Sequence, residues 1–498
     1  AIHITIEVNT DKGFKFFLVG LPDNAVKESQ QRIEAALKNN GFRWPGQKII
    51  INMAPADIRK EGSAYDLPIA IGILAASGQI QSETLSDYIM VGELSLDGNL
   101  QAVKGALSIA LRARKEGFSN IVLPEANAME AAIVEGINVI SVNKLSELID
   151  HLSLEKCIQP LVLNIQKVFR ESQHVFDIDF SDVKGQENVK RAMEIAAAGG
   201  HNVLLVGPPG AGKTMLAKRL PGILPPMSVQ EALETTKIHS VAGRMPSHSS
   251  ILSLRPFQSP HHTISDVALV GGGSFPQPGE ISLAHNGVLF LDELPEFKRT
   301  VLEVMRQPLE DRMIRISRAR FTVDYPASFM LIASMNPCPC GYYNHPEKSC
   351  VCGPGIVQKY LNKISGPLLD RIDLHVEVTP VSFHQLSAVS KTETSEAIRA
   401  RVVLARDIQS KRYESYENIH CNAQMSGKLL KKVCEIDQEG KALLREVMDR
   451  LGLSARAYDR ILKMARTIAD LDNEAFINTI HLSEAIQYRN LDRDSWAS

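Results

Sequence analysis

The sequence predicts an α/β protein in which a phosphate-binding core with a parallel sheet follows a first α/β domain and precedes a helical region. Three observations lead to this fold class. A short apolar run, residues 203–206, continues into a glycine-rich segment, residues 207–214, that fits the pattern G-x-x-x-x-G-K-[ST]. Residues 1–165 alternate strand-like and helix-like segments, and residues 395–498 have helical spacing throughout.

The composition is that of an ordinary globular chain. Its 498 residues carry a net charge of −2 and are 44% hydrophobic and 22% charged, and this length is typical of about three domains. Because the chain is not basic as a whole, any contact with nucleic acid has to come from a local basic patch. No apolar run approaches the roughly 20 residues of a membrane span and no signal peptide is recognisable, so we expect a cytoplasmic protein without a membrane partner. A strand pattern starts directly after Ala1, and we expect a short natural N-terminus to be missing.

Residues 1–165 form the first predicted domain. Their apolar patterns predict strands and helices in alternation, with strands at 2–8, 14–19, 49–51, 88–94 and 121–123 and helices at 26–37, 67–76 and 103–115. This is enough apolar surface for a separate core. Residues 166–178 have the composition of a linker to the next domain.

The phosphate-binding segment has a physical mechanism. Glycines let backbone N–H groups curl around phosphate oxygens, and the helix that follows presents its positive N-terminus to the same anion. Lys213 would reach the β and γ phosphates of ATP, and the Thr214 hydroxyl would ligate Mg²⁺. The predicted nucleotide-binding residues are Gly207, Pro208, Pro209, Gly210, Ala211, Gly212, Lys213, Thr214 and Met215.

The second half of a nucleotide site requires a buried strand that ends in carboxylates. The run 288–291 supplies it, and it is followed by Asp292, expected in the Mg²⁺ shell, and Glu293, expected to polarise the attacking water. A strand at 329–334 leads to Asn336, a polar residue that can position that water. The stretch between Lys213 and Asp292 is longer than one crossover needs, so we expect an insertion that includes residues 255–263 and the glycines 271–273.

Two groups of residues, a histidine pair and four cysteines, leave alternatives open. His261 and His262 in the insertion are expected to be turn residues rather than metal ligands. The cysteines at 338, 340, 350 and 352 are close enough in sequence to enclose one structural Zn²⁺; the alternative is a set of reduced, unligated thiols. The set of predicted zinc ligands is Cys338, Cys340, Cys350 and Cys352.

Residues 313–323 alternate like a hairpin and carry Arg315, Arg318 and Arg320. This is the densest basic cluster suited to contacting the phosphates of a nucleic acid, with residues 255–273 as the next candidate. The alternative is a solvated hairpin whose arginines contact nothing specific.

The segments 59–70 and 91–98 resemble the proteolytic domain of Lon-type proteases. Those proteases use a Ser–Lys dyad, but here the serine position falls on Ala64 and the lysine position on Ala106. Ser63 and Lys104 lie nearby, out of register. We therefore expect a peptidase fold kept as a scaffold without peptidase activity.

The order of motifs is specific. The phosphate loop, the insertion, Leu-Asp-Glu at 291–293, the arginine hairpin, Ser-Met-Asn-Pro-Cys at 334–338 and Leu-Leu-Asp-Arg-Ile-Asp at 368–373 resemble the magnesium-chelatase-like branch of AAA+ ATPases. With the Lon-like domain in front, the whole chain resembles the ComM (YifB) family. Residues 179–385 would then be the AAA+ core and residues 386–498 the helical lid.

The resemblance implies a hexameric, ATP- and Mg²⁺-dependent DNA helicase that drives branch migration during natural transformation, with recombination proteins as further partners. We then expect Arg315, Arg318 and Arg320 to contact the DNA. The resemblance also implies that Asn336 is the sensor-1 residue, Arg371 the arginine finger and Arg456 the sensor-2 residue. Ser454 is the expected N-cap of the helix that carries Arg456. Two other functions remain open at this point. One is a chelatase-type subunit that remodels a partner enzyme, and the other is a Lon-like ATP-dependent protease.

Overall fold

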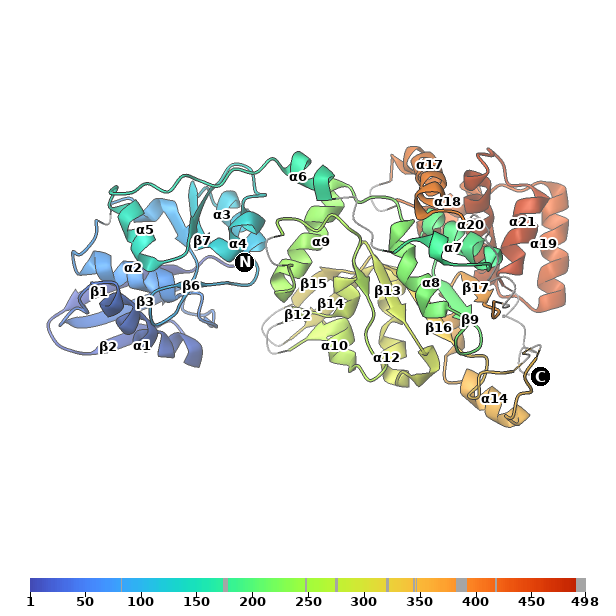
Figure 1. Cartoon of the computed structure of the whole chain (residues 1–498), viewed down its shortest axis with the longest axis horizontal. Coiled ribbons are helices and arrows are strands. Elements are labelled where there is room, and N and C mark those ends of the chain that lie inside the picture. The colour runs from blue at the N-terminus through green and yellow to red at the C-terminus, as the bar shows by residue number, and fades with distance from the viewer. Residues whose placement is uncertain are drawn as a thin grey trace. The chain divides into compact units, whose positions relative to one another are not determined.

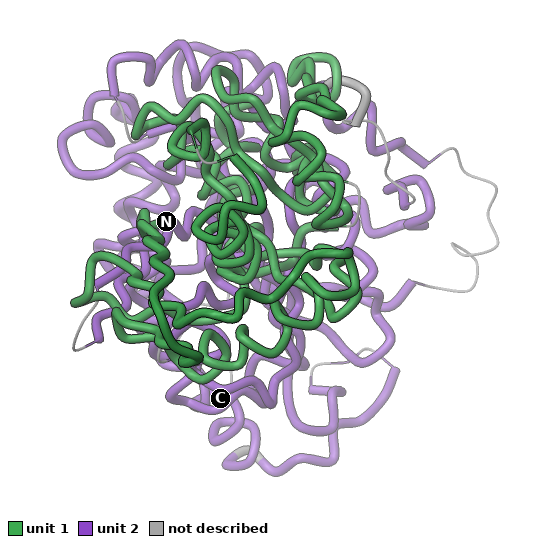
Figure 2. The backbone as a smooth tube through the Cα atoms, turned by 90° about the vertical axis from the view of Figure 1, so that its left-hand side faces the viewer, with its two compact units in different colours: residues 1–172, 229–253 green, residues 173–228, 254–498 purple. Residues whose placement is uncertain are grey.

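The computed structural model describes residues 1–81, 83–172, 178–246, 249–273, 276–318, 322–343, 345, 347–381, 392–416 and 419–489. The chain divides into two compact units, residues 1–172 with 229–253 and residues 173–228 with 254–498 (Figures 1 and 2). Among the described residues no helix is long and apolar enough to cross a membrane.

The N-terminal unit has a mixed three-stranded sheet. Its central strand β3 (Lys48–Ala54) pairs antiparallel with β1 (Thr5–Asp11) and parallel with β2 (Phe16–Val19). α1 (Asn24–Asn39) and α2 (Asp66–Ala76) pack their apolar side chains into the same core. The Asp23 side chain caps α1 by accepting a hydrogen bond from the Val26 N–H.

A second three-stranded sheet in this unit is entirely parallel, with β7 (Asn120–Pro124) between β4 (Tyr88–Met90) and β8 (Asn138–Val142). Parallel neighbours need crossover connections, which α3 (Ala106–Lys115) and α4 (Glu125–Ala131) provide. The predicted strand 88–94 is thus two strands, since β5 (Glu93–Leu94) pairs with β6 (Leu100–Gln101) instead. β8, α4 and α5 (Leu145–Leu152) have no counterpart among the predicted elements.

α9 (Val229–Ala242) packs against α3, so residues 229–253 group with the N-terminal unit although they follow the phosphate loop in sequence. The Gly105 N–H donates to the Ser240 carbonyl at 3.0 Å. The predicted core 179–385 includes residues 229–253, which the structure groups with the N-terminal unit instead. α6 (Ile165–Ser172) occupies part of the predicted linker 166–178. The remaining domain boundaries stay predictions.

The C-terminal unit is built on a parallel five-stranded sheet in the order β10-β13-β16-β9-β17. Both faces of this sheet are covered, and β9, β13 and β16 are buried along their whole length. These strands confirm the predicted strands at 203–206, 288–291 and 329–334 to within one residue. The five strands are β9 (Val203–Val206), β10 (Phe257–Gln258), β13 (Val288–Leu291), β16 (Met330–Met335) and β17 (Leu374–Glu377).

The side chains of β9 alternate between two cores. Val203 and Leu205 face the core shared with α7 (Glu187–Gly199), α8 (Lys213–Arg219) and the C-terminal helices. Leu204 and Val206 face the core shared with the insertion and the arginine hairpin. That hairpin is confirmed as β14 (Met313–Ser317) paired antiparallel with β15 (Thr322–Pro326). The other elements on this side are α10 (Asp266–Val270), β11 (Gly271–Gly272), β12 (Gln277–Pro278), α11 (Glu280–Leu283), α12 (Arg299–Val304), α13 (Arg306–Asp311), α14 (Pro354–Leu361) and α15 (Gly366–Leu369).

The described part of the C-terminal region is helical, as predicted, and comprises α17 (Ser395–Tyr413), α18 (Gly427–Val433), α19 (Gln438–Leu451), α20 (Ala455–Leu471) and α21 (Thr479–Gln487). Ser454 caps α20, because its hydroxyl accepts a hydrogen bond from the Ala457 N–H at 3.2 Å.

A buried ion pair ties α20 to the sheet. The Asp373 carboxylate, before β17, accepts hydrogen bonds from Arg460 on α20 and from the backbone N–H of Asn202. Burial alone would raise the pKa of Asp373, but Arg460 and His201 outweigh it and hold that pKa well below its usual value.

Candidate nucleotide and metal sites

Three candidate segments leave the sheet at the same edge. β9 and β16 are parallel with Val206 opposite Met335, and β13 and β16 are parallel with Leu291 opposite Ala333. The residues that follow these strands are the phosphate loop, Asp292 and Asn336. Ligands of open parallel sheets bind at this carboxyl edge, so the topology gathers the predicted nucleotide residues into one site.

The phosphate loop needs its glycines. A Cβ at Gly207 would lie 2.2 Å from the Val378 carbonyl oxygen, so no side chain fits there. Gly212 has φ +87° and directly precedes the first residue of α8. The loop therefore presents its backbone N–H groups at a helix N-terminus, the arrangement that binds phosphate.

Lys213 and Thr214 connect the loop to the two neighbouring strands. The Lys213 ammonium donates to the Asn336 side-chain oxygen at 3.0 Å and to the Gly207 carbonyl at 2.6 Å. Burial lowers the pKa of Lys213, while the charges of Asp292 and Glu293 act against that shift. The Thr214 hydroxyl donates to Asp292 Oδ2 at 2.7 Å. The two side chains predicted for the Mg²⁺ shell are thus adjacent, and their oxygens are the ligand type that Mg²⁺ prefers.

The carboxylates have different surroundings. Asp292 also accepts hydrogen bonds from the Ser334 hydroxyl and, at 3.0 Å, from the backbone N–H of Glu293. Glu293 has φ +54° and a side chain that is 59% exposed, so its carboxylate points out of the protein core. His262 lies in the predicted turn, and its Nδ1 is 3.6 Å from Glu293 Oε2.

Gln186 is a site residue that the sequence reasoning missed. It adopts φ +57° just before α7, and its side-chain amide donates to the carbonyls of Ala211 at 2.8 Å and Thr379 at 3.0 Å. Gln186 therefore fixes the phosphate loop to the segment after β17. The dipeptide Gly185-Gln186 before a helix was the available signal, but its partners are distant in sequence.

Arg371 and Arg456 lie at the opposite edge of the sheet. Leu374 of β17 pairs with Val203, the first residue of β9, and Arg371 precedes that pair. The Arg371 guanidinium is 2.5 Å from Glu310 Oε1, and its side chain is only 9% exposed. Arg456 is 62% exposed, with Nη1 3.7 Å from Asp370 Oδ2. The structure thus places Arg456 beside Asp370, the neighbour of Arg371 in the segment before β17. This segment and the phosphate loop lie at opposite edges of the sheet.

The hairpin arginines differ from one another. Arg315 makes a two-point ion pair with Asp324 on the facing strand, with distances of 2.8 and 2.9 Å, which neutralises its charge. Arg318 is exposed, and its Nε donates to the Gly273 carbonyl at 3.3 Å. Arg320 lies outside the described residues.

The four predicted zinc ligands converge. Their sulfur atoms all lie within 4.8 Å of one another, and three of the separations are 3.3, 3.5 and 3.6 Å. Four sulfurs around one Zn²⁺ at Zn–S distances of about 2.3 Å would be about 3.8 Å apart, so the thiols fit this ion. Burial disfavours the thiolate form of Cys340, but hydrogen bonds from the backbone N–H groups of Tyr342 and Val351 favour it. The pKa of Cys340 is thereby lowered to about 6. No other cluster of this kind is found in the described ranges.

The cysteine cluster borders the nucleotide site. A Cβ at Gly341, between the two cysteine pairs, would lie 2.4 Å from Pro209 Cδ, so this turn packs against the phosphate loop. Cys338 follows Asn336 by two residues. A metal that braces the turn would therefore also support the phosphate loop.

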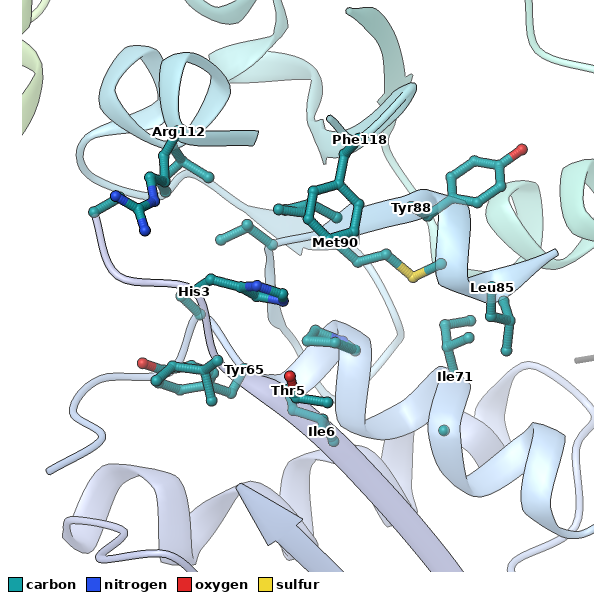
Figure 3. A pocket seen from close by; sticks show the side chains of 18 of the residues that line it. His3, Thr5, Ile6, Tyr65, Ile71, Leu85, Tyr88, Met90, Arg112 and Phe118 are labelled. Carbon is teal, nitrogen blue, oxygen red and sulfur yellow. The ribbon is translucent and has the colours of Figure 1, made fainter. Parts of the chain in front are cut away.

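The Lon-like positions show no catalytic dyad. The alanine side chains at positions 64 and 106 provide neither a nucleophile nor a base. The hydroxyl of the nearby Ser63 donates a hydrogen bond to the Glu93 carboxylate. Lys104 is exposed. Ala64 borders a mainly apolar cavity of about 530 Å³ inside the N-terminal unit, where the side chains of Met90, Phe118 and Ile71 face the interior (Figure 3).

Comparison with protein-family models defines the class of protein. The model described as "Magnesium chelatase, subunit ChlI" matches residues 179–386, "Subunit ChlI of Mg-chelatase" matches residues 6–127, and the subunit ChlI C-terminal model matches residues 392–489. The parallel sheet and phosphate loop thus belong to an AAA+ domain of the magnesium-chelatase type, which implies ATP hydrolysis.

Whole-chain relatives then identify the family. The chain is 44% identical over 492 residues to YifB of Escherichia coli (strain K12), covering 98% of this chain and 94% of that protein. It is 44% identical over 497 residues to competence protein ComM of Haemophilus influenzae, covering 98% and 95%. The chain belongs to the ComM/YifB family. A weaker likeness, 29% identity over 165 residues, links 30% of the chain to 28% of Lon protease 2 of Bacillus subtilis.

Proposed function

We propose that this protein is an ATP-driven DNA helicase that works as a ring of six identical subunits and promotes branch migration of recombining DNA during natural transformation. Its membership in a family that includes a competence protein supports a DNA-related role. The observation that carries the proposal is the placement of the phosphate loop at one edge of the sheet and of Arg371 at the other, which we interpret as the two halves of an ATPase site.

A divided site is completed by a second subunit. The four residues of β9 separate the two edges by about 10 Å, and Arg371 and Arg456 lie at the edge away from the phosphate loop of their own chain. In a head-to-tail ring the same two surfaces meet at every interface. A guanidinium supplied from the neighbour then neutralises charge that develops during phosphoryl transfer. Hydrolysis consequently depends on assembly, as expected for a translocating ring.

Within one subunit the roles follow from the contacts. Lys213 and the loop N–H groups bind the phosphates of ATP, and Thr214 with Asp292 would hold Mg²⁺, which neutralises phosphate charge when bound. Glu293 takes the proton of the attacking water, and Asn336, beside Lys213, orients that water. The four cysteines would hold a structural Zn²⁺ next to this site.

DNA is proposed to contact the β14–β15 hairpin. The hairpin joins α13 to β16, and β16 ends at Asn336, so a movement at the nucleotide site has a short route to the hairpin. Because Asp324 neutralises Arg315, the contact rests mainly on Arg318 and Arg320. Such phosphate contacts do not depend on base sequence and weaken with salt.

The test is the ATPase rate with and without single-stranded, forked and duplex DNA. Replacing Arg318 and Arg320 with alanine should leave basal ATPase and assembly nearly intact while DNA stimulation and branch migration fall together. Arg445→Ala, an exposed arginine on α19, removes one charge elsewhere and serves as the control. ATPase activity that no DNA stimulates would contradict the proposed function.

A chelatase-type remodelling subunit is the second candidate, because all three matching family models carry magnesium-chelatase names. This function predicts an ATPase that responds to a partner enzyme and not to DNA. The same DNA titration therefore separates the two candidates.

A further inference from the structure

His262 and Glu293 come from neighbouring strands of the central sheet. β10 runs parallel to β13, with Gln258 opposite Leu289. Beyond this pair one chain continues to the turn that contains His262, and the other continues to Asp292 and Glu293. Both residues therefore leave the sheet at its nucleotide-binding edge, and His262 Nδ1 approaches Glu293 Oε2 to 3.6 Å.

The turn that carries His262 is fixed on both sides. Arg255, just before β10, donates to the carbonyls of Pro225 and Asn286, each at 2.7 Å. After the turn, the Ile264 N–H donates to the His261 carbonyl at 3.0 Å, and Ser265 caps α10. Hydrogen bonds of the Arg255 and Ser265 side chains to the backbone therefore hold the two ends of the segment that carries His262.

The imidazole of His262 is oriented by its neighbours. Its ring meets the buried Phe297 edge to face, at 6.4 Å between centroids and an angle of 78°. The His261 ring lies 4.1 Å away, but His261 Nδ1 instead contacts the Thr263 hydroxyl at 2.9 Å within the turn. Of the two adjacent histidines, only His262 faces the catalytic carboxylate.

Glu293 needs such a neighbour. Its backbone is held by the N–H contact to Asp292 Oδ1, but among the described residues no side chain makes a hydrogen bond to its carboxylate. An exposed glutamate samples several rotamers, and only some of them aim an oxygen at a water beside the γ phosphate. An imidazole can donate one hydrogen bond to a carboxylate oxygen and leave the other oxygen free to act as a base.

We propose that His262 is a positioning residue that orients the Glu293 carboxylate for water activation. The inference rests on the proposed role of Glu293 in ATP hydrolysis and adds the residue that aims it. Closing the 3.6 Å gap to a hydrogen bond requires a shift of only a few tenths of an ångström. The insertion between α9 and β13 thereby contributes directly to turnover.

The test compares steady-state ATPase of His262→Ala, His262→Gln and the matched control His261→Ala. His262→Ala should lower kcat by at least about tenfold, with KM for ATP and nucleotide affinity within about twofold of wild type. His262→Gln, whose amide also donates a hydrogen bond, should recover part of the lost kcat. His261→Ala should behave like wild type.

Three results would overturn the inference: an unchanged kcat in His262→Ala, an equal loss in His261→Ala, or a loss confined to nucleotide affinity. Glu293→Gln, measured in parallel, separates this failure from failure of the proposed function. If Glu293→Gln retains turnover, the assignment of the catalytic carboxylate is wrong. If Glu293→Gln is inactive and His262→Ala is normal, only the role of His262 is wrong.

Discussion

Arg371→Ala should abolish steady-state ATPase although Arg371 does not reach the nucleotide site of its own chain. Arg371 precedes β17 at the amino edge of the sheet, while the phosphate loop follows β9 at the carboxyl edge. The four residues of β9 separate these edges by about 10 Å. A loss of turnover therefore has to reach the site through a neighbouring subunit.

The size of the loss follows from the chemistry. An arginine that stabilises the transition state of phosphoryl transfer is worth about 10³- to 10⁵-fold in rate, or about 4 to 7 kcal/mol. The ion pair with Glu310 provides a control, since Glu310→Gln removes the partner of Arg371 in its own chain but keeps the guanidinium. If Arg371 acts at a neighbouring site, Glu310→Gln should retain turnover. Equal losses in the two variants would assign Arg371 a structural role.

Mixing two inactive variants tests the second subunit directly. Lys213→Ala has an intact arginine edge, and Arg371→Ala has an intact phosphate loop. In randomly mixed rings, about one quarter of the interfaces combine the two intact surfaces. An equal mixture should therefore recover up to about a quarter of the wild-type ATPase if the interfaces act independently. No recovery in rings shown to contain both variants would refute the divided site.

Four further predictions concern single features of the chain. Protein purified without chelators should contain about one Zn²⁺ per chain, and Cys350→Ser should lose the metal and raise KM for ATP; well under one zinc per chain would contradict the site. In a fluorescent-nucleotide binding assay, Lys213→Ala should not bind ATP and Glu293→Gln should bind it. Glu293→Gln should nevertheless release no phosphate in a steady-state ATPase assay. Asp373→Asn should destabilise the C-terminal unit by about 3–5 kcal/mol in denaturant unfolding. Because the pKa of Asp373 is lower in the folded protein than in the unfolded chain, its contribution to the free energy of unfolding is present above about pH 4 and declines as the pH falls further. The difference in unfolding free energy between wild type and Asp373→Asn should therefore become smaller in acid. A difference that does not change with pH would contradict the ion pair. Casein should not be degraded, and ATP-dependent cleavage that Ser63→Ala removes would overturn the loss of peptidase function.

The predicted nucleotide-site residues could be proposed from the sequence because each part of the pattern is local. The phosphate loop, the carboxylates after an apolar run and Asn336 after the next strand are each read from consecutive residues. Parallel strands present their carboxyl ends at one edge, so their convergence could also be expected. The cap Ser454 and the four cysteines were found for the same reason, since each pattern lies within a few residues.

The elements that were missed or divided differently depend on contacts between distant residues. Gln186 donates a hydrogen bond to the carbonyl of Thr379, which is 193 residues away in sequence. His262 lies near Glu293 because β10 pairs with β13 in the sheet. The apolar run 88–94 does not reveal that residues 93–94 pair with 100–101 and not with the parallel sheet.

The sequence by itself determined the class of fold, the phosphate loop, the carboxylates that follow β13 and the thiol cluster. Glycine conformation, apolar periodicity and short ligand spacings are properties of adjacent residues. The tertiary structure decided which side chains face these groups. It neutralised Arg315 with Asp324, placed Arg371 at the far edge of the sheet and set His262 against Glu293. These outcomes depend on strand order and on the packing of whole elements, which no short stretch of sequence encodes.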